Sequence, residues 1–235
     1  MIFFSLVIPC FNEEATIKLI LDRTENSFIE NSIELILVNN GSTDNSEQVL
    51  KQLIKEYKHA KYIHLEKNRG YGGGILEGLK HCKGEIIGWT HADLQTDPLD
   101  SIKAFKYFNI EKQEQNLFVK GNRRNRAFSD HFFTFGMSIF ETILFRRVIY
   151  DINAQPTVFS KKFYQSWVNP PNDFSLDLYS YYLAIKKRYQ VKRIKVKFAS
   201  RIAGESKWNT GFTSKIKFIL RTIKYSLKLA SNDIN

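Results

Sequence analysis

The sequence has little cysteine, no long uninterrupted hydrophobic run and no basic segment at its start. Cys10 and Cys82 are the only cysteines in 235 residues. They are too few for a disulfide scaffold or a structural zinc site, and they fit a reducing cytosol. In the most apolar stretch the longest uncharged run spans the ten residues 131–140, short of the roughly 17–25 residues of a membrane-spanning helix. Because the first residues also lack the basic region of a secretory signal, we expect a cytoplasmic protein without a spanning helix.

Positive charge is abundant but unevenly distributed. The formal net charge is +11, and residues 1–100 carry 10 basic and 15 acidic side chains, against 25 basic and 9 acidic in residues 101–235. A hydrophobic content of 43% and a charged content of 25% are those of a globular chain, which excludes extensive disorder. The basic half indicates nucleic acid, a membrane surface or an anionic substrate as partner. No nucleic-acid-binding motif with interleaved aromatic residues is present, so we expect no nucleic acid partner.

Short apolar runs alternate with segments of helical spacing over the first 120 residues. This alternation predicts an α/β fold with a Rossmann-like, mainly parallel sheet flanked by helices. The predicted strands are 4–9, 33–38, 62–65, 85–90 and 117–120, and the predicted helices are 13–28, 44–57, 71–82 and 98–108. We expect Asp44 to cap the second helix, with Glu47 completing a capping box.

The second half is less regular. We expect one or two apolar helices over 128–149, an extended segment over 151–160, a helix over 173–187 capped by Asp173, a strand over 191–198, a polar loop over 200–210 and a helix over 212–230. No repeat or clear linker is evident. Residues 1–210 are therefore expected to form one domain, and residues 211–235 a C-terminal amphipathic helix of the same compact unit.

Polar segments follow four of the predicted strands, at 9–13, 39–44, 68–74 and 91–97. Ligands of such sheets bind at the carboxyl ends of the strands, so we expect these segments to meet at one edge. Five of the twelve glycines lie between Gly70 and Gly78. This run matches neither a dinucleotide-binding nor a Walker A pattern, and its glycines can serve simply to permit a tight turn from strand to helix.

The segment after the fourth strand carries candidate metal ligands. Alternate residues of an extended chain point to the same side, so His91, Asp93 and Gln95 could face one ion. Such a set can hold a divalent cation already bound to substrate phosphates, for which Mg²⁺ typically uses one or two protein ligands. The alternative makes Asp93 an ordinary loop or cap residue before the helix at Pro98.

Four ordered segments resemble the family 2 glycosyltransferases, which have the GT-A fold. Residues 6–14 (LVIPCFNEE) are similar to the opening of that family, residues 36–44 (ILVNNGSTD) to its Asp-Asp-Gly-Ser-x-Asp segment, and residues 91–95 (HADLQ) to its Asp-x-Asp metal motif. Residues 201–207 (RIAGESK) resemble the Arg-x-x-Gly-x-Ser-Lys loop of the dolichyl- and polyprenyl-phosphate sugar transferases within it.

The resemblance implies transfer of a sugar from a GDP- or UDP-linked nucleoside diphosphate sugar, with inversion of the anomeric carbon. It places the base and ribose contacts at Pro9, Phe11, Glu13, Asn39 and Asn40. It also has Ala92 contribute its backbone to nucleotide-sugar binding. It places the diphosphate contacts at Arg123, Arg201 and Lys207, whose basic side chains are charge-assisted donors. A divalent cation, Mg²⁺ or Mn²⁺, would bind at Asp93 and Gln95, with His91.

On the acceptor side the resemblance implies a lipid-phosphate or glycan acceptor, with Asp177 as the catalytic carboxylate and Gln155 as a contact. A hydroxyl acceptor needs a carboxylate base, whereas a phosphate acceptor is already anionic and would leave Asp177 to position groups. The alternative for Asp177 is compensation of the helix dipole in the first turn of its helix.

Two positions depart from the family pattern. His91 stands where the family has aspartate, and Asn39 and Asn40 stand where it has an aspartate pair. Asparagine offers a donor as well as acceptors, which changes how the base can be read, and imidazole shifts metal preference towards transition metals such as Mn²⁺. A catalytically degenerate, nucleotide-sugar-binding relative is therefore one alternative. A nucleotidyltransferase is another, although it typically has a glycine-rich loop directly after the first strand.

The C-terminal helix is expected to be amphipathic and basic. Its apolar stripe consists of Phe212, Ile216, Ile219, Ile223 and Leu227, and its basic stripe of Lys217, Arg221, Lys224 and Lys228. A helix of this kind is typical of an anionic membrane surface, and the apolar residues 132–145, followed by Arg146 and Arg147, form a second candidate. We expect peripheral attachment to the cytoplasmic face of the membrane; packing of both apolar faces on the core is the alternative.

Overall fold

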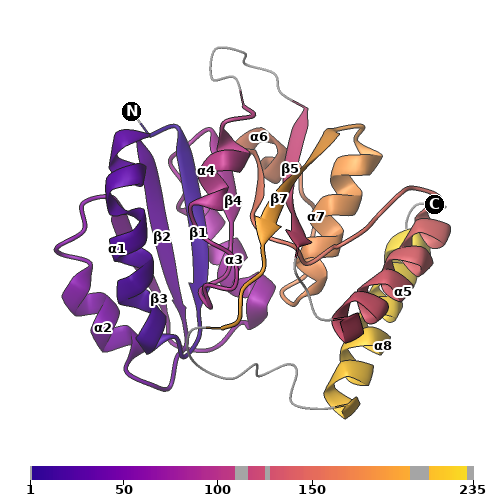
Figure 1. The fold of residues 1–235 in the computed structure, drawn as a ribbon, viewed down its shortest axis with the longest axis horizontal. Helices are drawn as coiled ribbons and strands as arrows, with labels where there is room; N and C mark the ends of the chain where they lie inside the picture. The colour runs from indigo at the N-terminus through magenta and orange to yellow at the C-terminus, as the bar shows by residue number, and fades with distance from the viewer. Residues whose placement is uncertain (1, 109–115, 125–127, 202–211, 232–235) are drawn as a thin grey trace.

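The computed structural model describes residues 2–108, 116–124, 128–201 and 212–231, with side chains from residue 136 in the helix that begins at 128 and from residue 219 in the last helix. A seven-stranded sheet forms the centre of the molecule (Figure 1). Its strands lie in the order β3-β2-β1-β4-β6-β5-β7. They are β1 (Phe4–Cys10), β2 (Ile33–Asn40), β3 (Ala60–Leu65), β4 (Ile86–Trp89), β5 (Leu117–Arg124), β6 (Thr157–Ser160) and β7 (Gln190–Lys197).

The sheet is parallel except at β6, which runs antiparallel to both of its neighbours, β4 and β5. The predicted mainly parallel α/β fold is therefore confirmed. The insertion of β6 sets Thr157 directly beside Lys120 of β5, and Lys120 in turn beside Arg193 of β7. These polar residues lie in the half of the sheet that the strand-end motifs do not cover.

Helices cover both faces of the sheet. One face carries α1 (Glu14–Glu30), α2 (Ser46–Leu53) and α4 (Asp100–Phe105). The other carries α3 (Gly70–Lys80), α6 (Lys161–Gln165) and α7 (Ser175–Lys186). Beside α7, α5 (Phe128–Phe145) and α8 (Phe212–Ser231) pack against each other at one end of the molecule (Figure 1). Among the described helices, none combines the length and the apolar character needed to cross a bilayer.

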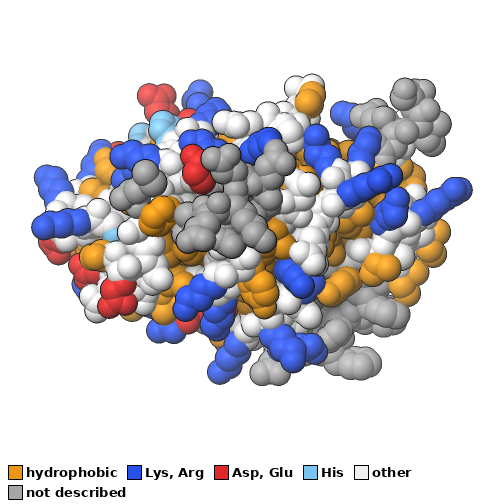
Figure 2. Space-filling view, turned by 90° about the horizontal axis from the view of Figure 1, so that it is seen from above, with side chains coloured by type: hydrophobic (Ala, Val, Ile, Leu, Met, Phe, Trp, Pro, Cys, Tyr) orange, Lys and Arg blue, Asp and Glu red, His pale blue; other side chains and the backbone are white. Residues whose placement is uncertain are grey.

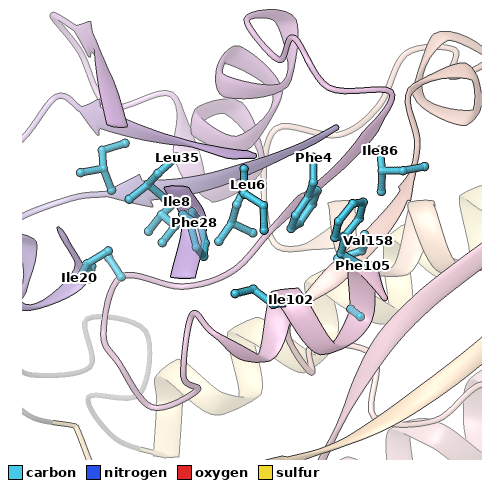
Figure 3. Packing of buried hydrophobic residues seen from close by; sticks show 14 of the residues in the cluster. Phe4, Leu6, Ile8, Ile20, Phe28, Leu35, Ile86, Ile102, Phe105 and Val158 are labelled. Carbon is cyan, nitrogen blue, oxygen red and sulfur yellow. The ribbon is translucent and has the colours of Figure 1, made fainter. Parts of the chain in front are cut away.

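The side chains of the central strands divide the hydrophobic core into two layers. Phe4 and Leu6 of β1 point towards α1 and α4, where Ile20 and Ile102 are buried against them (Figure 3). Val7 points to the opposite face and belongs to the second layer, with Ile75 of α3. Such two-sided burial is the reason that parallel strands appear in the sequence as continuous apolar runs.

The helix starts differ from the sequence predictions. Asp44 does not cap α2, which begins after Asn45; its Oδ1 accepts a hydrogen bond from the Ser46 amide at 3.0 Å, and Glu47 pairs with Lys51 instead of closing a capping box. In the same way, α7 begins after Phe174, and Oδ1 of Asp173 accepts from the Ser175 amide at 2.9 Å. The five-residue α6 was not predicted because it is too short to show a helical period.

The glycine-rich run forms the first turns of α3 and lies against neighbouring backbone. A Cβ at Gly72 would come within 2.6 Å of the Pro171 carbonyl oxygen, and a Cβ at Gly78 within 2.3 Å of Val7 Cγ1. Real Cβ atoms do not approach other atoms so closely. These glycines therefore let α3 pack directly on β1 and on the loop at 171–173.

Candidate active site

The polar segments at the carboxyl ends of the strands come together as predicted. The segment after β1 is hydrogen bonded to the segment after β2, since the amide of Asn12 donates to Ser42 Oγ at 3.0 Å and that of Glu13 to Ser46 Oγ at 2.9 Å. The segment after β4 meets the one after β7 through Arg201. The segment after β3 joins these two pairs, because Arg69 donates to Asn40 and Tyr71 contacts His91, so the segments form one contiguous polar cluster.

Asp93 lies in this cluster and is only 4% exposed. Its Oδ1 accepts a hydrogen bond from the Gln95 amide at 3.1 Å, and its Oδ2 lies 2.9 Å from a guanidinium nitrogen of Arg201. The side chain of Gln95 donates to the Ala199 carbonyl oxygen at 3.2 Å. The structure therefore brings Asp93 and Arg201 together, while Gln95 holds the segment that leads to Arg201.

The other residues predicted to bind the nucleotide lie in or beside the segments that follow β1, β2 and β4. Burial, reinforced by repulsion from Asp93, raises the pKa of Glu13 to about 7. Pro9, near the end of β1, and Phe11, directly after the strand, are half-buried, and Ala92 is buried next to Asp93 in the chain. When charged, the Glu13 carboxylate adds to the negative charge of Asp93, which a cation or a basic side chain has to balance.

Asn39 and Asn40 use their amide groups within the protein. Asn39 Oδ1 accepts from the Ser42 amide at 3.1 Å, and its Nδ2 lies 3.1 Å from His64 Nδ1. Asn40 Oδ1 accepts from the Arg69 amide at 3.0 Å, and its Nδ2 donates to the Gly70 carbonyl oxygen at 2.9 Å. Both side chains thus fix the loops that lead into α2 and α3, a role that combines donor and acceptor as only the amide can.

A buried polar network surrounds Asp177, in the first turn of α7. Its side chain is fully buried, and Oδ1 accepts hydrogen bonds from Gln155 Nε2 at 2.7 Å and from Lys120 Nζ at 3.1 Å. Lys120, also fully buried, donates to Thr157 Oγ1 at 2.7 Å, and Thr157 donates to Gln155 Oε1 at 3.0 Å. Asp177 and Gln155, predicted separately, therefore belong to one cluster.

Tyr71 of α3 connects this network to His91, in the segment that carries Asp93. Its hydroxyl accepts from Gln155 Nε2 at 3.2 Å and lies 3.1 Å from His91 Nε2. Burial lowers the pKa of His91 below its usual value, and burial raises the pKa of Tyr71 well above 10.0. A neutral imidazole and a protonated phenol are thus the favoured forms at this junction.

Lys120, Thr157 and Tyr71 are the site residues that sequence reasoning missed. Lys120 and Thr157 belong to no recognised motif and face each other only because β6 is inserted beside β5. Tyr71 sits inside the glycine-rich run, which drew attention to the glycines alone. One signal was available: a lysine continuing the apolar run 117–119 is unusual in a buried strand.

One predicted diphosphate contact, Arg123, bonds elsewhere than at Asp93. Arg123 is held by Asp151, with Nε donating to Oδ1 at 2.8 Å and the backbone amide to Oδ2 at 2.9 Å. Its guanidinium carbon lies 5.3 Å from the centre of the Phe198 ring. Lys207 lies outside the described residues, so its predicted role stays a prediction.

The donor set suits a cation shared with a substrate better than one caged by protein. Within the described ranges, no three His, Cys, Asp or Glu side chains converge as a metal cluster. Asp93 offers one buried carboxylate, with the His91 imidazole two residues before it, which is the number of ligands used for cations that also bind phosphate oxygens. The residues therefore fit a cation that also binds a substrate's phosphate oxygens, which Asp93 would hold with His91 nearby.

The surface of α5 and α8 joins apolar and basic side chains. Ile139 and Ile143 of α5 are 44% and 72% exposed, and Leu220 and Leu227 of α8 are 60% and 52% exposed. Exposed basic residues flank them at Arg146, Arg147, Arg221, Lys224 and Lys228. On the face seen in Figure 2, the described acidic side chains lie in the left half, and the right half shows lysine and arginine among apolar side chains.

The chain belongs to glycosyltransferase family 2. The family described as Glycosyl transferase family 2 matches residues 5–124, a segment that contains the first three of the four motifs identified in the sequence. A relative in Proteus mirabilis (strain HI4320), undecaprenyl-phosphate 4-deoxy-4-formamido-L-arabinose transferase, is 38% identical over 123 residues, which are 51% of this chain and 36% of the relative. Bacillus subtilis (strain 168) has a putative glycosyltransferase, CsbB, that is 32% identical over 126 residues, 53% of this chain and 38% of the relative. The chain thus spans little more than a third of these relatives.

Solved structures confirm the GT-A fold. Glucosyl-3-phosphoglycerate synthase from Mycobacterium tuberculosis, in complex with UDP, aligns with a TM-score of 0.73 over 97% of this chain and 80% of its own, at 18% identity. A mannosyltransferase from Pyrobaculum calidifontis, in complex with GDP-Man and Mn²⁺, aligns with a TM-score of 0.63 over 86% of this chain and 58% of its own, also at 18% identity. The fold is therefore that of enzymes solved with nucleotides bound.

Proposed function

We infer that this protein is a glycosyltransferase that moves a sugar from a GDP- or UDP-linked nucleoside diphosphate sugar to a lipid-phosphate or glycan acceptor. The observation that carries this proposal is the junction of two sites at one sheet edge. Asp93 and Arg201 form a donor side, and the Asp177 cluster forms an acceptor side, with Tyr71 and His91 between them. Family membership and the names of the undecaprenyl-phosphate relatives support it.

On the donor side, the chain's residues would balance the charge of a leaving diphosphate. Arg201 contributes a guanidinium that can exchange Asp93 for phosphate oxygens as a charge-assisted donor. Asp93, freed from Arg201, would hold a divalent cation, with His91 nearby; two of the structural relatives were solved with Mn²⁺. When bound, such a cation neutralises charge that develops on the diphosphate. Lys207 and Arg123 remain proposed diphosphate contacts.

On the acceptor side, the acceptor oxygen would form a bond to the anomeric carbon from the face opposite the diphosphate. The bond from that carbon to the diphosphate oxygen breaks, and the diphosphate leaves with the electron pair, so that the configuration inverts. A hydroxyl acceptor would give its proton to Asp177. A phosphate acceptor carries no proton that must be removed, and Asp177 would then orient it together with Gln155.

The membrane surface is the proposed place of reaction. The exposed apolar residues of α5 and α8 and the basic residues beside them are the combination that attaches a protein to anionic lipid. The names of the undecaprenyl-phosphate relatives point to a lipid acceptor. We therefore place the protein at the cytoplasmic face of the membrane, bound peripherally through this surface.

A transfer assay tests the function. The purified protein is incubated with UDP- or GDP-sugars, Mn²⁺ or Mg²⁺, and vesicles containing undecaprenyl phosphate; nucleoside diphosphate release and the mass of the lipid product are followed. We expect release that depends on the acceptor and is lost in Asp93→Ala and in Asp177→Asn. Asp22→Asn, which changes an exposed aspartate of α1 paired with Lys18, serves as control. Nucleotide binding without turnover on any acceptor would instead identify a degenerate relative.

A further inference from the structure

Lys120 is a fully buried lysine that the reaction outlined above does not use. It lies on β5 between Thr157 of β6 and Arg193 of β7, and its side chain points to the face covered by α7, where Asp177 lies. Burying an ammonium group costs several kcal/mol even when it is paired, and an apolar residue of similar volume is often the more stable choice. Stability alone is therefore a poor explanation for a lysine at this position.

The direction of each hydrogen bond in the cluster follows from Lys120. An ammonium group only donates, so Thr157 Oγ1 accepts from Lys120 and turns its own proton to Gln155 Oε1. That contact fixes the orientation of the Gln155 amide. Its Nε2 then donates to Asp177 Oδ1 at 2.7 Å and to the Tyr71 hydroxyl at 3.2 Å.

The result is an asymmetric carboxylate. Oδ1 of Asp177 receives hydrogen bonds from both Lys120 and Gln155, whereas Oδ2 is buried without a hydrogen bond among the described residues. A buried carboxylate oxygen left without a donor is costly. Because Lys120 and Gln155 hold Oδ1, Oδ2 remains the atom that can meet an incoming group.

We propose that Lys120 is a positioning residue for transfer: it anchors Asp177 through Oδ1 and thereby directs Oδ2 to the acceptor. This role rests on the proposed glycosyl transfer and adds a residue to it. Lys120 acts through Asp177 and Gln155, and it makes no contact with the Asp93–Arg201 donor side. Loss of the ammonium charge is therefore expected to affect turnover and leave donor binding unchanged.

The charges around Lys120 allow a pH test. Asp177 of α7 and Asp151, before β6, favour the charged form of Lys120, and Arg193 of β7 disfavours it. The positive charge of Lys120 in turn disfavours the protonated form of His91. Burial outweighs the two carboxylates and lowers the pKa of Lys120 to about 8. The ammonium group is thus lost as the pH rises through about 8, and the anchoring of Asp177 is lost with it.

The experiment compares Lys120→Met, Lys120→Arg and the control Lys18→Met, whose lysine is exposed and pairs with Asp22. Steady-state kcat and the KM for the nucleotide sugar are measured between about pH 6 and 9.5, a range that spans the pKa of Lys120. We expect kcat of the wild type to fall above about pH 8. In Lys120→Met, kcat should fall by about 100-fold or more, without an alkaline decline and with donor KM unchanged, and Lys120→Arg should restore part of kcat and keep it at high pH.

Three outcomes overturn the proposal. A wild-type kcat in Lys120→Met removes the role of Lys120, and so does a loss confined to donor KM. If Lys120→Met does not fold, as shown by the absence of a cooperative thermal unfolding transition, Lys120→Arg decides the question: an alkaline decline identical to that of the wild type contradicts the proposal. A wild type that transfers no sugar to any acceptor overturns the proposed function itself, which separates the two failures.

Discussion

Arg201 forms an ion pair with Asp93: a guanidinium nitrogen lies 2.9 Å from Oδ2. The side chain of Arg201 is 23% exposed and that of Asp93 is 5% exposed. The two residues that the family resemblance assigns to the diphosphate and to its cation therefore bind each other. A diphosphate with its cation would satisfy both at once, because phosphate oxygens would accept from the arginine and the cation would bind the aspartate. We therefore expect ligand binding at this site to be an exchange of partners.

This exchange predicts opposite effects for one substitution. In Arg201→Met, Asp93 has no competing partner, so Mn²⁺ should bind more tightly in the absence of nucleotide. Nucleoside diphosphate should bind about 10–100-fold more weakly in the presence of Mn²⁺, the scale of a lost hydrogen bond to a charged group. Electron paramagnetic resonance of free Mn²⁺ and calorimetry of nucleotide binding measure the two affinities. Changes of the same sign in both would contradict the exchange.

The close packing of α3 on β1 predicts that Gly78→Ala destabilises the fold. Its Cβ would lie 2.3 Å from Val7 Cγ1 and 2.9 Å from Val38 Cγ2, and overpacking of this kind costs about 1–3 kcal/mol. Gly136→Ala in α5 is the matched control, because no atom of the described residues outside the helix's own backbone lies within 4 Å of the added Cβ; there alanine should stabilise the helix by up to about 1 kcal/mol. Equilibrium denaturation in urea measures both, and equal effects at the two positions would refute the packing explanation.

Glu141 predicts a pH-dependent contact between α5 and α8. Its Oε1 accepts from Ser226 Oγ at 2.6 Å, while Oε2 is buried without a partner among the described residues. Burial raises its pKa from 4.5 to about 7, so the folded protein holds this proton more tightly than the unfolded chain does. Its stabilising contribution is complete below pH 4.5 and is lost as the pH rises through about 7.

Glu141→Gln should therefore be more stable than the wild type at pH 8.5, by up to about 3 kcal/mol, and similar to it near pH 4. Denaturation curves at the acid and the alkaline pH isolate the contribution of Glu141, because every other titrating residue is common to the variant and the wild type. Stability profiles that run parallel from acid to alkaline pH would show that Glu141 does not titrate in this way.

Membrane attachment through α5 and α8 predicts a loss of vesicle binding when two exposed apolar side chains are changed. The double variant Ile143→Ser, Leu227→Ser should bind anionic vesicles at least about 10-fold more weakly, since each buried aliphatic side chain contributes about 1.5–3 kcal/mol. Ile29→Ser is the control, because Ile29 is 53% exposed on α1. Co-sedimentation with phosphatidylglycerol vesicles measures binding; wild-type binding by the double variant would remove this surface from consideration.

The sequence predicted the strands and the donor-side edge because both depend on local patterns. Apolar runs such as 33–38 identify buried parallel strands, and the segments that follow them must share an edge. Lys120 could not be placed in this way, because its partner Asp177 is 57 residues distant on α7 and meets it only when α7 packs against the face of the sheet.

The capping predictions at Asp44 and Asp173 were also wrong, because they too depended on a local pattern alone. Each aspartate does bind a backbone amide two residues ahead, but the helix begins one or two residues later than the pattern indicated. At α2, tertiary contacts determine this start: Ser46 Oγ, which could otherwise serve its own helix, accepts a hydrogen bond from the Glu13 amide. A pattern confined to one segment carries no information about such a partner.

One contact of α8 affects how the protein can be dissected. Arg221 Nε lies 3.4 Å from Asp173 Oδ2, and its guanidinium carbon lies 5.7 Å from the centre of the Phe174 ring. Phe174 in turn stacks on Tyr71 with ring centres 4.5 Å apart, and Tyr71 touches His91 and Gln155. A deletion of residues 212–235 would remove the helix proposed to face lipid and also the contacts that support Phe174 against Tyr71. Lost activity in a shortened chain would therefore not show that the reaction needs a membrane, and the two properties have to be separated with single substitutions on the exposed side of α8.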